Sequence, residues 1–146
     1  MTANETPSES DIIEINRSIV EEFRRTGNVE RFPGAPIVVL TVTGARSGRE
    51  QVVPLGFTRD GDDVIVIASK GGRPENPAWY HNLKANPQVK VELPGDSFQA
   101  EAIVTEGDER QRLYDAQAAQ IPVFAEYQTR TTRQIPVIRL RRTASA

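Results

Sequence analysis

The chain of 146 residues carries 18 basic and 20 acidic residues, a net charge of −2 that argues against a dedicated nucleic-acid-binding protein. Its 38% hydrophobic and 26% charged residues are typical of one globular domain. With no cysteine and one histidine, disulfides, cysteine nucleophiles and zinc sites are excluded, and we expect no metal. The polar start MTANETPSES and the lack of a long apolar run favour neither a secretory signal nor a spanning helix, so we expect a cytoplasmic protein.

The first predicted element is an amphipathic helix over residues 10–27, after a tail at 1–9. Apolar residues recur there at three- and four-residue steps, and Ser8 is the expected N-cap. The recurring positions are Ile12, Ile15, Ile19 and Phe23. We expect the helix to cover the core; the alternatives are a lid or a docking helix, including peripheral contact with a membrane.

Three β-strands are predicted next, over residues 37–43, 51–58 and 63–69. Asp60 and Gly61 favour a tight hairpin between the second and third. The second strand contains Pro54, which cannot donate a backbone hydrogen bond, and Gly56, which has no side chain. Such a strand belongs at a sheet edge or a bulge, where a ligand can approach the backbone.

The rest of the chain alternates between helical and extended patterns. Asn76 is the expected N-cap of a short helix over 78–85, with Pro77 at its first helical position. Further helices are predicted at about 105–120 and 123–129, and further strands at 88–93, 97–104 and 134–141. Because most connections are hairpins, we expect about six strands in a largely antiparallel sheet, closed enough to hide its edges. The fold class is α+β, mainly β, with one domain over 10–142 and a C-terminal tail at 143–146.

Standard catalytic constellations are missing from the sequence. His81 is the sole histidine and no nucleophile elbow accompanies it, so we interpret it as a helix-surface or packing residue. No carboxylate pair or metal motif stands out. A reactive group is therefore expected from a cofactor.

Two basic, glycine-containing loops are the candidate binding elements. Residues 44–49 supply Arg46, Ser47 and Arg49, and residues 69–73 supply Ser69 and Lys70. Guanidinium groups and backbone N–H groups near glycine bind phosphate and carboxylate oxygens. Between the loops, the strand with Val53, Pro54 and Leu55 offers an apolar shelf for a planar ring. Trp79 is either a core residue or a wall for that ring.

The runs LTVTGARSGREQVVPLGF, VIVIASKGGRPENPAWYHNLKANPQVKVEL and EYQTRTTRQIPVIRL resemble the deazaflavin-dependent nitroreductase family across about residues 37–140. The resemblance implies a split β-barrel and the coenzyme F420, whose phosphate and oligoglutamate tail are anionic. By position it assigns Arg46, Ser47, Ser69 and Lys70 to the tail and phosphate, with Arg49 as a helper. The other implied cofactor-binding residues are Val53, Pro54, Leu55, Ile67, Ala78, Trp79 and Asn82, together with Gln51, which stands where family members often carry a basic residue.

The resemblance also bears on the substrate side. It places Tyr127 over the substrate, where Tyr127 or Ser69 would donate a hydrogen bond to the acceptor oxygen. Phe124 stands where the nitroreductase has a tyrosine, and Arg130 where it has a tryptophan. The implied reaction is hydride transfer from reduced deazaflavin to a quinone, enone or nitro compound.

Two other functions stay open from the sequence. The same loops suit the single phosphate of flavin mononucleotide, so a flavin-binding split-barrel reductase is one alternative. A non-catalytic barrel that carries a cofactor or a hydrophobic ligand is the other. A homodimer is expected by analogy with related barrels.

Overall fold

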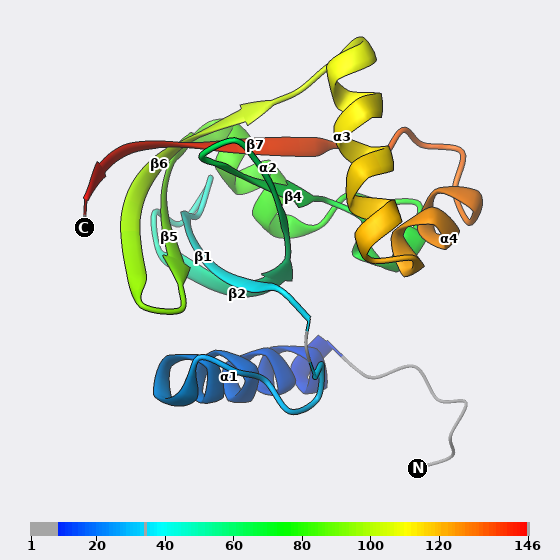
Figure 1. Cartoon of the computed structure of the whole chain (residues 1–146). Coiled ribbons are helices and arrows are strands. Elements are labelled where there is room, and N and C mark those ends of the chain that lie inside the picture. The colour runs from blue at the N-terminus through cyan, green and yellow to red at the C-terminus, as the bar shows by residue number, and fades with distance from the viewer. Residues whose placement is uncertain (1–8, 34, 146) are drawn as a thin grey trace.

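The computed structural model describes residues 9–33 and 35–145 (Figure 1). Within these residues, one sheet of seven strands has the order β2-β1-β5-β6-β7-β4-β3, with antiparallel neighbours throughout. The strands are β1 (Ile37–Thr43), β2 (Glu50–Gly56), β3 (Thr58–Asp60), β4 (Asp63–Ile67), β5 (Gln88–Leu93), β6 (Asp96–Val104) and β7 (Val137–Ser145). The helices are α1 (Glu9–Thr26), α2 (Ala78–Ala85), α3 (Gly107–Gln120) and α4 (Val123–Thr129), with a 3₁₀ turn η1 (Lys70–Gly72).

Hydrophobic periodicity predicted most of these elements. The spans of β1, α2, β5 and α4 are those expected from the sequence. The α3 helix begins at Gly107 rather than 105, because the backbone N–H and hydroxyl of Thr105 both donate to the Val137 carbonyl, at 3.0 and 2.8 Å. The expected cap Ser8 lies outside the described residues.

The expected six strands and closed sheet were wrong. The predicted strand 51–58 is divided at Phe57, whose N–H donates to the Pro36 carbonyl at 3.2 Å and whose side chain is 9% exposed in the core. Before Phe57 the chain pairs with β1, and after it with β4. The sheet is therefore open, and β2 and β3 form its two edges (Figure 1). The predicted edge position of the strand with Pro54 is confirmed.

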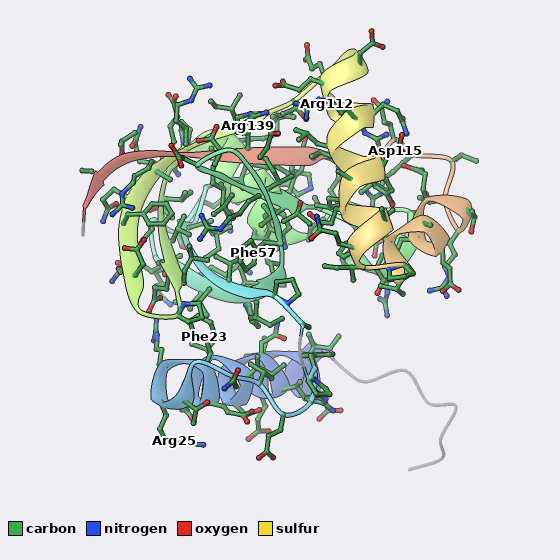
Figure 2. The ribbon with its side chains drawn as sticks, viewed as in Figure 1. Phe23, Arg25, Phe57, Arg112, Asp115 and Arg139 are labelled. Atoms are coloured by element: carbon green, nitrogen blue, oxygen red, sulfur yellow. The ribbon has the colours of Figure 1, made fainter. Side chains whose placement is uncertain are left out.

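The core lies inside the curl of the sheet, where Phe57 points (Figure 2). The α2 helix packs against β1 and β6, whereas α3 and α4 pack on each other and α3 contacts β3 and β7. The α1 helix forms a separate layer beside β2, and Phe23 points from it toward the sheet (Figures 1 and 2). Ile19, Val20 and Phe23 are buried against β1 and β2, so the expected covering helix is confirmed. Within residues 9–33 and 35–145, no helix combines the length and apolarity needed to cross a bilayer.

A cluster around Arg139 joins β7 to the β3–β4 hairpin and α3 (Figure 2). Its guanidinium binds Asp60 at 2.7 Å, Asp63 at 2.9 Å and Glu109 at 3.0 Å, and Arg112 binds Asp60 at 3.1 Å. Hydrogen bonds from Arg112 and then Arg139 lower the pKa of Asp60 to about 2, from an ordinary 3.8. The carboxylate of Asp60 therefore stabilises the fold in its charged form.

We predict that Asp60→Asn lowers the free energy of unfolding by about 1 kcal/mol at pH 7, after allowance for its partial exposure. Because the folded pKa is the lower one, this contribution is present above about pH 4 and disappears as the pH falls toward 2. Urea unfolding at pH 7, 4 and 2 measures it. Asp62→Asn, at an exposed position in the same hairpin, is the matched control. An equal loss at all three pH values would contradict the assignment.

Candidate functional site

The turn between β1 and β2, residues 44–49, is held closed by its own backbone. The Gly44 N–H donates to the Arg49 carbonyl at 2.7 Å, and the Gly48 N–H donates to the Gly44 carbonyl at 3.0 Å. The Ser47 hydroxyl accepts from the Arg49 N–H at 3.1 Å. A Cβ at Gly44 would lie 2.6 Å from the Ser47 Oγ and 3.1 Å from the Arg49 carbonyl oxygen, so glycine allows the turn to close tightly. Ser47 therefore has a structural contact in addition to its expected binding role.

Two asparagines of α2 and its C-cap hold this turn against the helix. Asn82 accepts a hydrogen bond from the Ala45 N–H through Oδ1 at 3.0 Å and donates from Nδ2 to the Gln51 Oε1 at 2.8 Å. Asn86 donates to the Thr43 carbonyl at 3.3 Å. The half-buried Asn82 thus joins the turn, β2 and α2 through a single amide. Gln51 is likewise engaged with protein.

A pocket of about 500 Å³ opens where the turn, β2 and α2 meet. It brings together six of the residues predicted from sequence, namely Arg46, Ser47, Arg49, Gln51, Ala78 and Asn82. Gly44, Ala45, Glu50 and His81 complete the lining. His81 is exposed and belongs to the pocket, a placement that its position on a short helix did not predict.

The pocket is electropositive at its basic turn. Arg46 and Arg49 are exposed, and the described part of the chain offers neither side chain a hydrogen bond or ion pair. Unpaired guanidinium groups bind carboxylate and phosphate oxygens bidentately. Glu50 is the one carboxylate among the lining residues and opposes this charge in part.

The N-terminus of α2 also reaches the pocket, through Ala78. The sequence placed the N-cap at Asn76, which was wrong: Pro77 occupies that position, with no side-chain cap and no acid in the first turn. The Asn76 Oδ1 instead accepts from Arg133 at 2.7 Å. An uncapped helix N-terminus favours an anion, because its first N–H groups lack partners and its dipole is positive there.

The second basic loop, residues 69–73, does not line the pocket of Arg46. Lys70, Gly71 and Gly72 have consecutive positive φ angles of 47°, 65° and 79°. The η1 turn packs on α4, and a Cβ at Gly72 would lie 2.7 Å from the Tyr127 carbonyl oxygen. Lys70 pairs with Glu75 at 3.2 Å, and this hydrogen bond lowers the pKa of Glu75. Ser69 and Lys70 do not line the pocket of Arg46, so the described pocket contains only one of the two loops.

The predicted ring-binding residues are divided between the surface and the core. Pro54 and Leu55 are half-buried on the edge strand. Val53 and Trp79, at 7% and 5% exposure, lie in the main core, and Ile67 lies in a second cluster with Tyr114 and Phe124. Burial therefore supports the core interpretation of Trp79 rather than that of a wall.

Tyr127 is half-buried on α4, beside the second loop. Its ring contacts Phe124 edge-to-face, with centroids 5.4 Å apart, and the Arg130 guanidinium lies 5.6 Å from its centroid. The described contacts place Tyr127 near Gly72 rather than in the pocket of Arg46.

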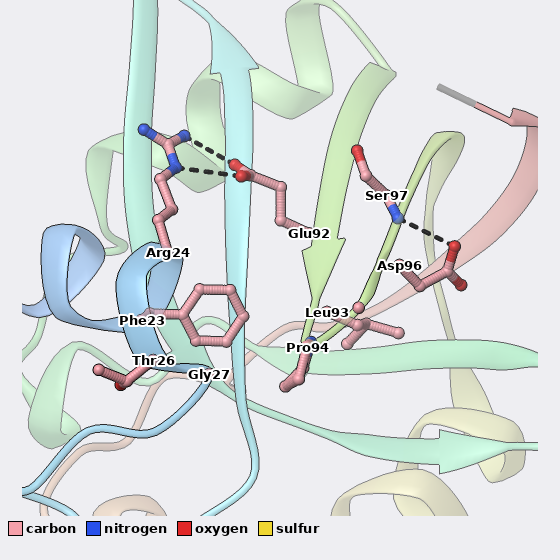
Figure 3. A pocket seen from close by; sticks show the side chains of 10 residues that line it. Phe23, Arg24, Thr26, Gly27, Glu92, Leu93, Pro94, Asp96 and Ser97 are labelled. Carbon is pink, nitrogen blue, oxygen red and sulfur yellow. Dashed lines mark hydrogen bonds and ion pairs between the residues drawn. The ribbon is translucent and has the colours of Figure 1, made fainter.

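A second pocket, of about 540 Å³, lies between the end of α1 and the β5–β6 hairpin (Figure 3). Its charged groups are already paired: Arg24 binds Glu92 through two hydrogen bonds, at 3.0 and 2.7 Å, and Asp96 binds Arg142 at 3.3 Å. None of the predicted site residues lines it. The pocket of Arg46 is therefore the stronger candidate for binding an anion.

An open antiparallel sheet with a basic pocket beside its edge strand is consistent with a cofactor-dependent oxidoreductase. The family model described as F420H(2)-dependent quinone reductase matches residues 15–141, so the chain belongs to this family. The F420H(2)-dependent quinone reductase Rv1261c of Mycobacterium tuberculosis H37Rv is 39% identical over 116 residues, which cover 77% of this chain and 78% of the relative. The predicted class of enzyme and the coenzyme F420 are thereby confirmed at the level of the family.

Solved structures agree with this family. A structure titled F420-H2 Dependent Reductase (FDR-A) is 42% identical with a TM-score of 0.68, covering 72% of this chain and 93% of its own. A structure titled as a domain-swapped dimer is 36% identical with a TM-score of 0.70, covering 91% of this chain and 99% of its own.

We predict that Asn82→Ala loosens the basic turn without unfolding the protein. The loss of the bonds to Ala45 and Gln51 should cost about 1–2 kcal/mol and raise the exchange rate of the Ala45 amide about tenfold or more. Hydrogen exchange followed by NMR measures it. Asn86→Ala, which removes only the 3.3 Å bond to Thr43, is the matched control. Unchanged protection of Ala45 would contradict the assigned role of Asn82.

Proposed function

We propose that the pocket of Arg46 binds the anionic part of coenzyme F420 and that the protein reduces a quinone. The observation that carries this proposal is the convergence of two unpaired guanidinium groups and an uncapped helix N-terminus on one pocket. These groups suit a phosphate or a carboxylate-rich tail, so the residues present fit the coenzyme. The quinone specificity comes from the family name and the quinone reductase Rv1261c.

Different residues would bind the anionic part and the ring of the coenzyme. Arg46, Arg49 and the first N–H groups of α2 would bind the anionic part, while Ser47 and Asn82 keep the turn in place. The outer side of β2, paired with no strand in the described residues, would support the ring beside Pro54 and Leu55. Lys70 and Ser69 would supply a second set of contacts to the anionic part. Bound deazaflavin supplies a hydride, which converts a quinone to a hydroquinone after one proton is added.

The protein's further part in this reaction is orientation and polarisation of the quinone. Tyr127, half-buried beside Phe124, would donate its phenolic proton in a hydrogen bond to the acceptor oxygen as negative charge develops there. Ser69 is the alternative donor, since no hydrogen bond to its hydroxyl is recorded in the described residues. Close packing of α3 and α4 behind Tyr127 would limit access of water.

We also propose that the active form is a homodimer of the single domain at residues 10–142, in the cytoplasm. The relative solved as a domain-swapped dimer supports the assembly. The α1 helix is a separate layer, buried through one face on β1 and β2, and is the natural element to exchange. Light scattering on the purified chain gives the mass that decides between monomer and dimer.

The first test concerns the anion pocket. We predict that Arg46→Gln weakens binding of oxidised F420 by about 1–2 kcal/mol, roughly five- to thirtyfold, because one charge-assisted contact at an exposed site is lost. Affinity should also fall with added salt. Fluorescence titration measures both, with Arg59→Gln on β3 as the matched control, since Arg59 is equally exposed and outside the pocket.

Three outcomes would contradict the proposal in different ways. Equal affinity of wild type and Arg46→Gln would move the anion site elsewhere. Preference for flavin mononucleotide would replace the coenzyme. Tight binding of F420 without oxidation of its reduced form by a panel of quinones would identify a carrier instead of an enzyme.

The second test concerns Tyr127. We predict that Tyr127→Phe lowers kcat for quinone reduction about tenfold or more and leaves F420 affinity within twofold, because only the hydroxyl toward the acceptor is removed. Stopped-flow oxidation of the reduced coenzyme measures kcat. Tyr80→Phe, a core tyrosine on α2, is the matched control. Unchanged turnover with every quinone would remove the catalytic role of Tyr127.

A further inference from the structure

The loop from Ala68 to Asn76 is bound by a single guanidinium from the other end of the chain. Arg133 donates from Nε to the Arg73 carbonyl at 3.1 Å and from Nη2 to the Ser69 carbonyl at 2.8 Å. Its Nη1 donates to the Ala68 carbonyl at 3.2 Å and to the Asn76 Oδ1 at 2.7 Å. Four acceptors spread over nine residues of chain therefore converge on one side chain.

All four acceptors are neutral, and no carboxylate pairs with Arg133 in the described residues. Burial lowers the pKa of this guanidinium, and the nearby charge of Glu75 opposes that effect. Arginine nevertheless remains protonated in proteins, so the site retains a positive charge. The side chain is half-buried, and the removal of part of a guanidinium from water is offset here by its four hydrogen bonds rather than by a counter-ion.

The loop needs such support because its backbone is strained. Lys70 has a φ of 47°, an unfavourable left-handed conformation for a residue with a Cβ, and it precedes two glycines that are also left-handed. The buried Gly72 fits against α4 only because it has no Cβ, since one would lie 2.8 Å from the Arg130 Cβ. Two hydrogen bonds of the loop itself close this turn, from the Gly72 N–H to the Ser69 carbonyl at 3.0 Å and from the Arg73 N–H to the Lys70 carbonyl at 3.2 Å, and Arg133 adds four more from outside the loop.

Arg133 is itself held in place from two helices. The Gln128 Nε2 on α4 donates to the Arg133 carbonyl at 2.8 Å, and the Gln128 Oε1 accepts from Arg110 on α3 at 2.9 Å. The Arg133 N–H donates to the Thr131 hydroxyl at 3.2 Å. A continuous set of hydrogen bonds therefore runs from α3 through α4 to the loop of Lys70.

We propose that Arg133 is a positioning residue that sets the conformation of residues 68–76 and so determines how strongly Lys70 contributes to coenzyme binding. This inference rests on the proposed function. Five donors in a rigid plane can satisfy four acceptors at once, which a lysine cannot do with the same charge. Arg133→Lys therefore separates the geometry of the side chain from its charge.

The experiment is a pair of double-mutant cycles on F420 affinity, one combining Arg133→Lys with Lys70→Gln and the other combining Arg133→Lys with Arg46→Gln. We expect Arg133→Lys to weaken F420 binding about tenfold. Lys70→Gln should weaken binding fivefold or more in the wild-type protein. When Arg133→Lys is already present, Lys70→Gln should weaken binding by less than a further twofold. Arg46→Gln should have its full effect with and without Arg133→Lys, because none of the hydrogen bonds of Arg133 in the described residues involves the turn at 44–49. This selective coupling would not follow from a general loss of stability.

Arg141→Lys, an exposed arginine on β7, is the matched control. If Arg133→Lys does not fold, Asn76→Ala removes the shortest of the four bonds and should show the same selective coupling to Lys70 with a smaller loss. In the free protein, the amide resonances of Gly71 and Gly72 should shift in either variant and stay unchanged in Arg141→Lys.

The results separate the two proposals. If wild type and Arg141→Lys bind no F420, the proposed function fails, and this inference fails with it. If wild type binds F420 but Arg133→Lys binds within twofold of it, or if Lys70→Gln costs the same in both backgrounds, the proposed function stands. The positioning role of Arg133 alone is then overturned.

Discussion

The amide of Asn82 is the contact on which the candidate site depends. By accepting from Ala45 and donating to Gln51, it fixes the basic turn and the edge strand β2 to the helix that follows them by some thirty residues. Without this contact, the turn would still be closed by its own backbone, but it would lose the link from the Ala45 N–H to α2. With it, both guanidinium groups line the same pocket as the N-terminus of α2. One neutral side chain thereby helps to bring three separate features together at the candidate anion site.

Arginines in this protein fall into two groups, according to whether an acid faces them. Arg139 binds three carboxylates and ties β7 to the hairpin and α3, so its charge is used within the fold. Arg46, Arg49 and Arg133 have no carboxylate partner in the described residues. The salt bridges of Arg139 lie at the β3–β4 hairpin, whereas Arg46 and Arg49 line the candidate pocket and Arg133 binds the loop of Lys70. Two guanidinium groups that line one pocket without a carboxylate partner among the described residues support an anionic ligand better than the small net charge of the chain does.

The sequence predicted the elements well wherever a local pattern decides them. Strand alternation and helical periodicity identified the spans of β1, α2, β5 and α4. The break at Phe57 was missed because QVVPLGFT reads as one extended segment, while the change of partner from β1 to β4 depends on contacts far along the chain. The same limit explains Asn76: its local sequence favours a cap, but Arg133, 57 residues later, binds its side chain. Local propensity gives the elements, whereas their partners are set by tertiary contacts.

The two basic loops had equal weight in the sequence, and the structure gives them different physical characters. The turn at 44–49 is held by its own backbone and by Asn82, so it can be formed before any ligand arrives. The loop at 68–76 holds Lys70 in a left-handed conformation that a remote arginine supports, and its lysine is paired with Glu75. A ligand that recruits Lys70 must compete with that exposed ion pair, which is a small cost in water. We infer that the first loop supplies the preformed anchor, and that the second adds affinity only when α3 and α4, which hold Arg133, are correctly packed.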